Sequence, residues 1–243
     1  MPTLRTLSVL PLIALALLAA HAHAAGLNDT GVTFCGDDST NTANCAVVGA
    51  DGGTHPRQDG NFVKPFNFTK IANNGSTLPA SAALGTGATD WACTKDNVTG
   101  LVWEVKTTNG LRSQYHTYTW YNSNPATNGG DNGTASGGTC FTAGRCDTEK
   151  FVADVNAAGL CGATDWRMPK IKELEGIVDF GVSHPAIDPT YFPNTSVSDV
   201  WSGSPNADNA SSVWFVSFGS GFSDDGSDSR PYNGGVRLVR GGQ

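Results

Sequence analysis

Six cysteines restrict the folds open to this 243-residue chain more than any other feature. Their number is even and they follow an apolar leader, so we expect all of them to form disulfides in an oxidising compartment. Each disulfide should stabilise the fold by about 2–4 kcal/mol, mainly by restricting the unfolded chain. The six are Cys35, Cys45, Cys93, Cys140, Cys146 and Cys161.

Residues 1–24 have the pattern of a secretory signal peptide. Arg5 gives a positively charged start, residues 7–20 form an almost unbroken apolar run, and the tripeptide Ala-His-Ala fits a cleavage site. The run of about 14 residues is shorter than the roughly 20 that a membrane-spanning helix needs. No later segment is apolar enough to cross a bilayer. We predict an exported protein that is periplasmic, secreted or at the cell surface; an uncleaved anchor is the alternative.

The spacing of the cysteines favours one pairing scheme. Cys35 and Cys45 lie close together and far from the rest, so we expect them to pair. Cys146 and Cys161 flank a predicted helix and could join its two ends, which would leave the other two for each other. A zinc site is the alternative, but the chain has no Cys-x-x-Cys pair and no histidine at ligand spacing to support it.

The chain is acidic, with a formal net charge of −7. Loss of the leader would remove Arg5, the only charge before residue 25, and bring the net charge to −8. Phosphate contacts need lysine and arginine, so we expect no nucleic-acid partner. The same balance argues against anionic membranes and sulfated polymers.

The rest of the chain divides into an irregular N-terminal extension, residues 25–92, and one compact domain, residues 93–243. The extension mixes Gly, Asn, Asp and Pro with a few aromatic residues that could dock it. Residues 122–139 form a long polar loop of the domain. Apolar residues on both faces make 212–218 a central strand. The β-forming residues predict strands at 101–105, 117–121, 200–202, 212–218 and 236–240.

Two helices are predicted between these strands. Asp147 can cap the first helix, and Gly159 ends it. Pro169 suits the first turn of the second helix, which should run to Gly181. Two helices followed by several short antiparallel strands make an α+β domain.

Four motifs in this order and spacing resemble the Lcl C-terminal domain family of bacterial proteins. They are Thr-Gly-Leu-Val-Trp-Glu at 99–104, Asp-Trp-Arg-Met-Pro at 165–169 followed by Glu173 and Leu174, Trp-Ser-Gly-Ser at 201–204, and Val-Arg-Leu-Val-Arg-Gly-Gly at 236–242. The resemblance covers about residues 93–243, with departures at Met168 and Gly203. It implies a C-type-lectin-like fold, export and a binding or adhesion role. The family's namesake is an adhesin that binds glycosaminoglycans, a ligand that the acidic charge of this chain does not favour.

One group of residues could form either a catalytic or a structural cluster: Glu104, Asp165, Trp166, Arg167 and Glu173. We interpret it as structural, because a buried tryptophan with an arginine stacked on it and paired to a carboxylate would lock a loop onto the next helix. No nucleophile motif accompanies the histidines, and Gly-x-Ser-x-Gly is absent. We expect no catalytic residues and a binding module rather than an enzyme. A carbohydrate-active enzyme or its accessory subunit, or a structural surface protein, is the alternative.

Residues 219–235 are the strongest candidate for a binding site. Small polar residues with a tyrosine are typical of adaptable binding loops, and Trp201 and Trp214 could lie beneath or beside them. The aspartates could instead bind Ca²⁺, although their spacing is not that of an EF-hand; a solvated hairpin is the third interpretation. We expect a glycan or protein ligand on a surface, and no cofactor unless Ca²⁺ binds. The candidate residues are Asp224, Asp225, Asp228, Arg230, Tyr232 and Asn233.

Overall fold

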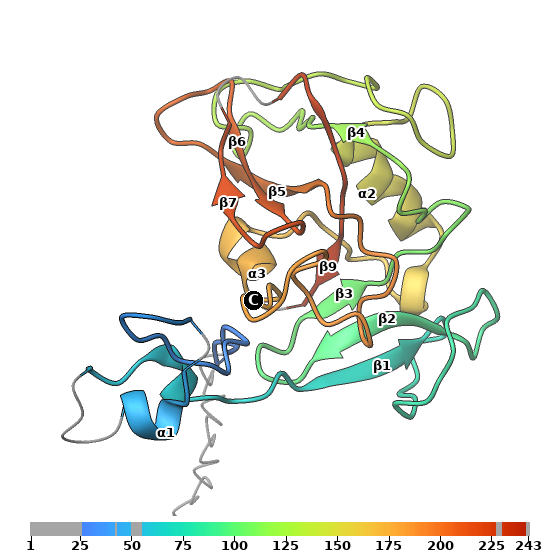
Figure 1. The fold of residues 1–243 in the computed structure, drawn as a ribbon. Coiled ribbons are helices and arrows are strands. Elements are labelled where there is room, and N and C mark those ends of the chain that lie inside the picture. The colour runs from blue at the N-terminus through green and yellow to red at the C-terminus, as the bar shows by residue number, and fades with distance from the viewer. Residues whose placement is uncertain (1–25, 42, 50–54, 227–229, 242–243) are drawn as a thin grey trace, which may run out of the picture.

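The structure is a computed structural model that describes residues 26–41, 43–49, 55–226 and 230–241, shown as a ribbon in Figure 1. The predicted signal peptide, residues 1–24, lies outside the described residues. The described part is a mixed α+β structure with antiparallel sheets, as predicted. No helix within it has the length and apolarity needed to cross a bilayer.

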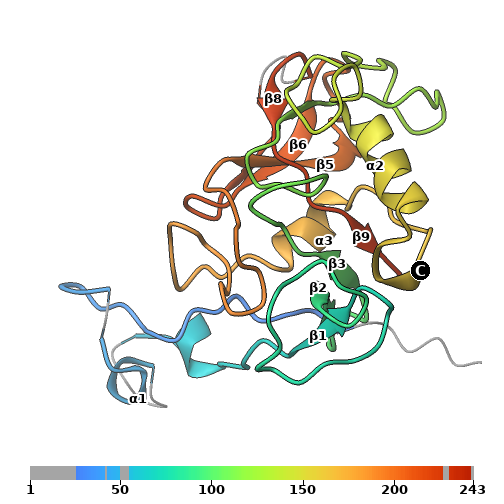
Figure 2. The ribbon, with the colours of Figure 1, turned by 90° about the vertical axis from the view of Figure 1, so that its right-hand side faces the viewer.

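The first sheet joins the start of the folded domain to its end. Its strand order is β1-β2-β3-β9, with every neighbouring pair antiparallel. Because β9 pairs with β3, the C-terminal strand lies beside the strands that open the domain (Figures 1 and 2). The strands are β1 (Phe68–Ala72), β2 (Trp91–Asp96), β3 (Val102–Glu104) and β9 (Val239–Arg240).

Strand β1 lies inside the segment that we expected to be irregular, so that expectation is wrong for residues 68–72. The strand pairs with β2 from Phe68, opposite Asp96, onward. Its third residue, Lys70, is buried and places its ammonium 3.8 Å from the centre of the Trp91 ring. A lysine at a buried position conceals the apolar pattern of a strand, because the pattern assumes that charged side chains face solvent.

Two smaller sheets lie at the opposite end of the molecule in Figure 1. The three-stranded sheet has the order β5-β6-β7, and β4 pairs with β8. Strand β6 is central, as predicted, and its residues are buried except for the half-buried Trp214. The strands are β4 (Tyr118–Thr119), β5 (Asp199–Pro205), β6 (Val213–Ser217), β7 (Ser223–Asp224) and β8 (Asn233–Gly234).

The helices are short. The predicted cap of α2 (Thr148–Ala157) is confirmed, because the carboxylate of Asp147 accepts the backbone N–H of Lys150 at 2.8 Å. Helix α3 (Ile171–Glu175) ends at Gly176, well before the predicted Gly181. Ile177 and Val178, which follow it, are buried in a turn. Their spacing fits a helix, although the helix has already ended. The remaining single turns are α1 (Cys45–Val48), η1 (Asp59–Asn61) and η2 (Leu160–Gly162).

The core consists of two apolar clusters. In the first, Phe151 and Val155 of α2 pack with Trp120 and Trp201. In the second, Leu174 of α3 packs with residues that include Trp103, Phe192 and Phe218. Each cluster contains residues of the first sheet and of the β5–β6 sheet, so the two clusters together join the two ends of the molecule.

All six cysteines form disulfides. The Cys35–Cys45 pair agrees with the prediction, but the other two pairs are Cys93–Cys161 and Cys140–Cys146. The predicted pairs Cys146–Cys161 and Cys93–Cys140 are therefore wrong. The ten residues of α2 rise about 15 Å, whereas the two Cα atoms of a disulfide must lie within about 7 Å. A bridge across the helix ends could not close.

Candidate functional site

The Asp165–Arg167 motif lies at a junction between α3 and the C-terminal strand. Both Nη atoms of Arg167 donate to the carboxylate of Glu173 at 2.7 Å, and Nη2 also donates to the carbonyl of Gly241 at 3.0 Å. Burial alone would raise the pKa of Glu173, but hydrogen bonds from Arg167 and from the N–H of Lys170 outweigh it, so the pKa is lowered. We call this contact of Arg167 with Glu173 and Gly241 the clasp, because it joins α3 to the end of the chain by an ion pair and a hydrogen bond.

The other members of that predicted cluster lie elsewhere. Asp165 accepts a 2.6 Å hydrogen bond from Arg240, which lowers its pKa. Trp166 is buried and donates its indole N–H to the carbonyl of Leu160 at 2.9 Å. No ring contact joins it to Arg167 in the described part of the chain, so the predicted stacking is not formed.

Glu104 belongs to a buried charge network beneath β3. Its carboxylate accepts hydrogen bonds from Lys106 at 2.8 Å and from the backbone N–H of Leu238 at 2.9 Å, and its carbonyl accepts one from Arg237 at 2.8 Å. Burial lowers the pKa of Lys106 to about 8, although Glu104 opposes this. The network ties β3 to the last strand and presents no carboxylate to solvent.

Three loops meet at the end of the molecule that holds β4 and β8 (Figures 1 and 2). They are the long loop after β4, the turn between β5 and β6, and the segment that enters β8. Between them lies a polar hollow of about 280 Å³, which we call the loop pocket. Its lining residues are Asp131, Gly133, Thr134, Ser211, Arg230 and Pro231.

Arg230 connects the segments that surround the loop pocket. Its guanidinium lies 4.3 Å from the centre of the Trp120 ring and donates to the carbonyl of Asp131, while its backbone N–H donates to the carbonyl of Ser211 at 3.2 Å. Only 1% of the residue is exposed, and its Nε and Nη2 have no partner among the described residues. Burial lowers the pKa of Arg230. Through its side chain and its backbone, Arg230 thus connects its own segment to the long loop and to the β5–β6 turn.

The aspartates of the C-terminal segment serve local turns. Asp224 accepts the backbone N–H of Asp225 at 2.7 Å, and Asp225 accepts the side-chain amide of Asn206. Asp228 lies outside the described residues. Within the described residues no three His, Cys, Asp or Glu side chains gather in a group that could hold a metal ion.

The aromatic candidates divide into buried and exposed residues. Trp201 is buried under Gly234 and donates its indole N–H to the carbonyl of Tyr118 at 2.8 Å, so it supports the loops from below. Trp214 is half-buried in β6. Tyr232 is 65% exposed next to the pocket residue Pro231, and the exposed Asn233 pairs with Thr119. Tyr232 is therefore the aromatic candidate that faces solvent.

Besides Gly133, three pocket residues with polar side chains were not singled out from the sequence: Asp131, Thr134 and Ser211. Two come from the long polar loop and one from the β5–β6 turn. The length and polarity of residues 122–139 were the available signal for the first two. Ser211 carried no signal, because its place beside the other loops depends on the tertiary fold.

A larger hollow, of about 350 Å³, lies beside the long loop. Its lining includes Tyr121, Glu149 and Arg167. The guanidinium of Arg167 is already bound by Glu173, and Glu149 accepts the backbone N–H of Ser123 at 2.7 Å. Its charged groups are thus engaged within the protein, whereas no side-chain hydrogen bond engages the hydroxyl groups of Thr134 and Ser211 within the described residues.

Comparison with known proteins identifies one family. A model of the Lcl C-terminal domain family matches residues 92–240, which is 149 of the 243 residues. No curated protein and no solved structure matches the chain significantly. The matched segment contains Arg167, Glu173 and every residue that lines the loop pocket.

Proposed function

The chain belongs to the Lcl C-terminal domain family, and from that premise we propose that it is an exported binding module whose loop pocket holds a glycan displayed on a surface. The observation that carries the proposal is the convergence of three loops on one polar hollow of about 280 Å³. Binding residues are commonly carried by loops on a rigid scaffold.

The chemistry of the loop pocket supports a hydroxylated ligand. Thr134 and Ser211 offer hydroxyl groups that can both donate and accept, and the exposed Asp131, whose Oδ1 accepts the backbone N–H of Gly133 at 2.8 Å, offers its second carboxylate oxygen. Tyr232 adds a broad, rigid surface beside the pocket at a small cost in conformational entropy. Sugar rings present hydroxyl groups and apolar ring faces together, which these side chains match.

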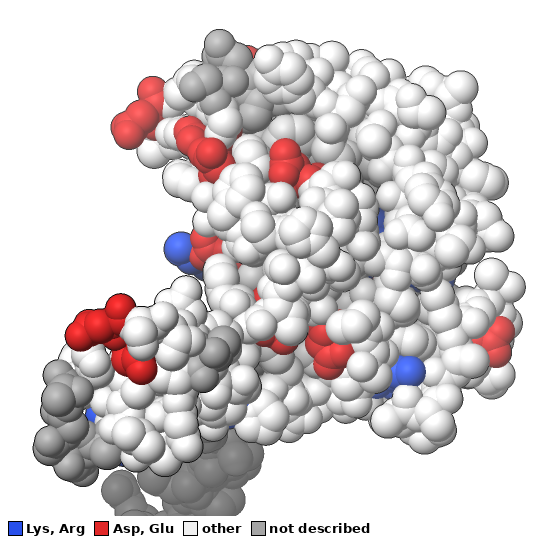
Figure 3. Space-filling model, viewed as in Figure 1, with Lys and Arg blue, Asp and Glu red and all other residues white. Residues whose placement is uncertain are grey.

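The charge of the molecule favours a ligand that is not polyanionic. The chain carries a net charge of −7. Figure 3 shows that charged side chains are sparse over β4 and the long loop on the face in view. The guanidinium of Arg230, the cation nearest the pocket, is enclosed and does not contribute an exposed positive surface. A neutral glycan therefore suits the site better than a sulfated polymer.

We further propose a C-type-lectin-like fold for this domain. Its last strand, β9, pairs with β3 in the sheet that opens the domain, and the loops gather at the opposite end, which suits a module anchored at one end and binding at the other. Export is part of the same proposal, supported by the leader pattern of residues 1–24 and by the three disulfides.

A glycan array with Ca²⁺ and with EDTA tests the proposal. We expect the full chain, without its leader, to bind a restricted set of neutral glycans without cleaving them. Ser211→Ala with Thr134→Val should weaken binding about tenfold or more, because two hydrogen-bonding groups are lost while side-chain volume is nearly kept. Hydrolysis of a bound glycan would replace the proposal with the enzyme alternative, and loss of binding only in EDTA would add Ca²⁺ to it.

The matched pair Tyr232→Ala and Tyr115→Ala locates the site. Both tyrosines are well exposed, at 65% and 73%, but only the first adjoins the loop pocket. We expect Tyr232→Ala alone to weaken glycan binding. Equal affinity in the two variants would place the ligand elsewhere.

A further inference from the structure

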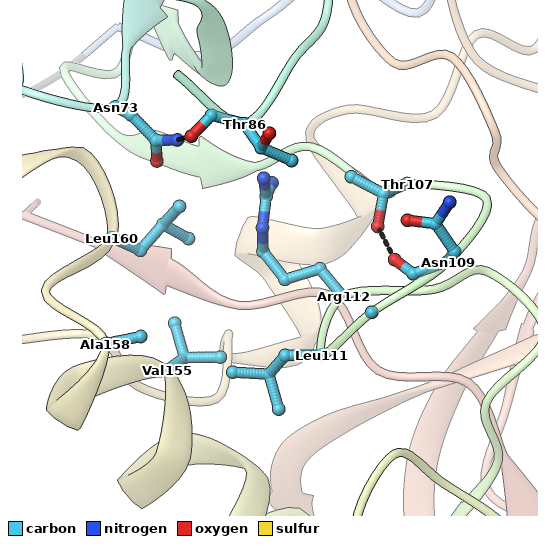
Figure 4. A pocket seen from close by; sticks show the side chains of 10 residues that line it. Asn73, Thr86, Thr107, Asn109, Leu111, Arg112, Val155, Ala158 and Leu160 are labelled. Atoms are coloured by element: carbon cyan, nitrogen blue, oxygen red, sulfur yellow. Dashed lines mark hydrogen bonds between the residues drawn. The ribbon is translucent and has the colours of Figure 1, made fainter. Parts of the chain in front are cut away.

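A second pocket, of about 270 Å³, lies at the sheet end of the molecule, away from the loop pocket (Figure 4). Three segments form it: the connection between β1 and β2, the loop that follows β3, and the end of α2 with the turn η2. The Cys93–Cys161 disulfide joins η2, which supplies Leu160 to the pocket, to the neighbouring strand β2. One wall is therefore held in place covalently as well as by packing.

Arg112 reaches into this pocket with part of its guanidinium unused. Its Nη1 donates to the carbonyls of Ala92, at 3.0 Å, and Val105. No hydrogen bond engages Nε or Nη2 within the described residues, and these two atoms are not among the buried, unpartnered ones. Nε and Nη2 form one edge of the guanidinium, the edge that grips a carboxylate with two parallel hydrogen bonds.

The positive charge of Arg112 has no carboxylate bound to it within the described residues. Burial lowers its pKa, and only Glu104 opposes this shift. That carboxylate is already hydrogen-bonded to Lys106 at 2.8 Å. The pocket therefore presents a half-buried cation whose nearest negative charge is committed to another residue.

The opposite wall of the pocket is apolar. Figure 4 shows Leu111, Val155, Ala158 and Leu160 gathered on one side of the Arg112 side chain, with Asn73 and Thr86 beyond its guanidinium end. The 2.7 Å hydrogen bond from Thr107 to the carbonyl of Asn109 shapes the loop that carries Arg112. A ligand that fits must therefore combine one anionic head with a compact apolar body.

We propose that this pocket binds a small organic monocarboxylate, whose carboxylate pairs with Nε and Nη2 of Arg112 while its apolar body covers Leu111 and Leu160. Inorganic phosphate would use the same guanidinium edge but would leave the apolar wall exposed to water, so the carboxylate class fits better. The site is separate from the loop pocket and does not depend on the proposed glycan ligand.

Benzoate is the probe, with benzamide, acetate and inorganic phosphate as matched comparators. Titrated into the full chain without its leader and followed by ligand-observed NMR and calorimetry, benzoate should bind about tenfold or more tightly than each of the other three. Benzamide lacks the charge, acetate lacks the apolar body, and phosphate lacks the ring. Equal binding of benzoate and benzamide, or no benzoate binding at millimolar concentration, would overturn the proposal.

Three variants tie the binding to the pocket. Arg112→Lys keeps the charge but loses the paired donors, so benzoate affinity should fall about tenfold. Arg145→Lys makes the same exchange in an arginine bound to Asp154, outside the pocket, and should leave affinity unchanged. Ala158→Phe fills the mouth of the pocket from an exposed helix end, without touching the carbonyl contacts of Arg112, and should abolish binding. Unchanged benzoate affinity in either pocket variant, once folded, would overturn the proposal.

Discussion

Two buried sites, one beside β3 and one among the loops, hold their cations in different ways. At the sheet end, Lys106 and Arg237 are hydrogen-bonded to Glu104, one through its carboxylate and one through its carbonyl. At the loop end, Arg230 lies on Trp120 and a carbonyl with no carboxylate bound to it within the described residues. A charge pair therefore ties β3 to the segment before β9, whereas an aromatic ring and a carbonyl hold Arg230, as they also hold Lys70 in β1.

The largest effect should come from the charge pairing at the sheet end. Glu104→Gln keeps a hydrogen-bond acceptor but leaves Lys106 without a counter-charge, so the free energy of unfolding should fall by about 3–5 kcal/mol. Chemical denaturation measures this directly. Glu175→Gln is the control, because Glu175 pairs with the exposed Lys172 and should change stability by less than about 1 kcal/mol. Similar losses in both variants would remove the distinction between buried and exposed pairs.

Two disulfides allow a second comparison between the sheet end and the loop end. Replacing Cys93 and Cys161 with serine opens a loop of 68 residues, and replacing Cys140 and Cys146 opens one of 6. Loop-closure entropy predicts losses of about 4 kcal/mol and about 2 kcal/mol. Thermal unfolding of the two double variants gives the order. A larger loss at the loop end would mean that strain or packing, not chain entropy, decides the contribution.

Arg230→Ala tests whether Arg230 stabilises the loops. The change removes packing over Trp120 and should cost about 2 kcal/mol, less than Glu104→Gln because no charge pair is broken. Hydrogen exchange should increase in the long loop and leave β2 and β3 unchanged. Faster exchange in the first sheet would show that the two ends are coupled.

The smallest effect is expected at the clasp. Arg167→Lys loses the two-pronged contact with Glu173 and should lower stability by about 1 kcal/mol, while glycan binding stays unchanged. Thermal melting and array binding on the same protein separate these outcomes. Unchanged melting together with weakened binding would assign Arg167 to a ligand site in the neighbouring hollow.

Local signals predicted the local features well. The Asp147 cap, the central strand β6 and the Cys35–Cys45 pair each depend on neighbouring residues, and the sequence indicated them. The other two disulfides depend on distant packing, so the spacing of the cysteines misassigned them, and strand β1 was missed because its buried Lys70 hides the apolar pattern.

In the candidate site, too, local sequence signals and tertiary packing gave different information. Residues 219–235 were indicated by composition, yet their tertiary roles differ: Arg230 is enclosed, while Tyr232 faces solvent. Ser211 and Thr134 join them only because three loops converge. Composition can indicate a binding loop, but burial decides which of its residues a ligand can reach.

The most direct test of the binding account is a calorimetric titration of the strongest array glycan into wild type and into the Ser211→Ala, Thr134→Val variant, with Tyr115→Ala as control. The account predicts saturable binding to wild type and to the control, and affinity at least about tenfold lower in the double variant. Equal affinity in all three proteins, or no glycan bound by folded wild type, would contradict it.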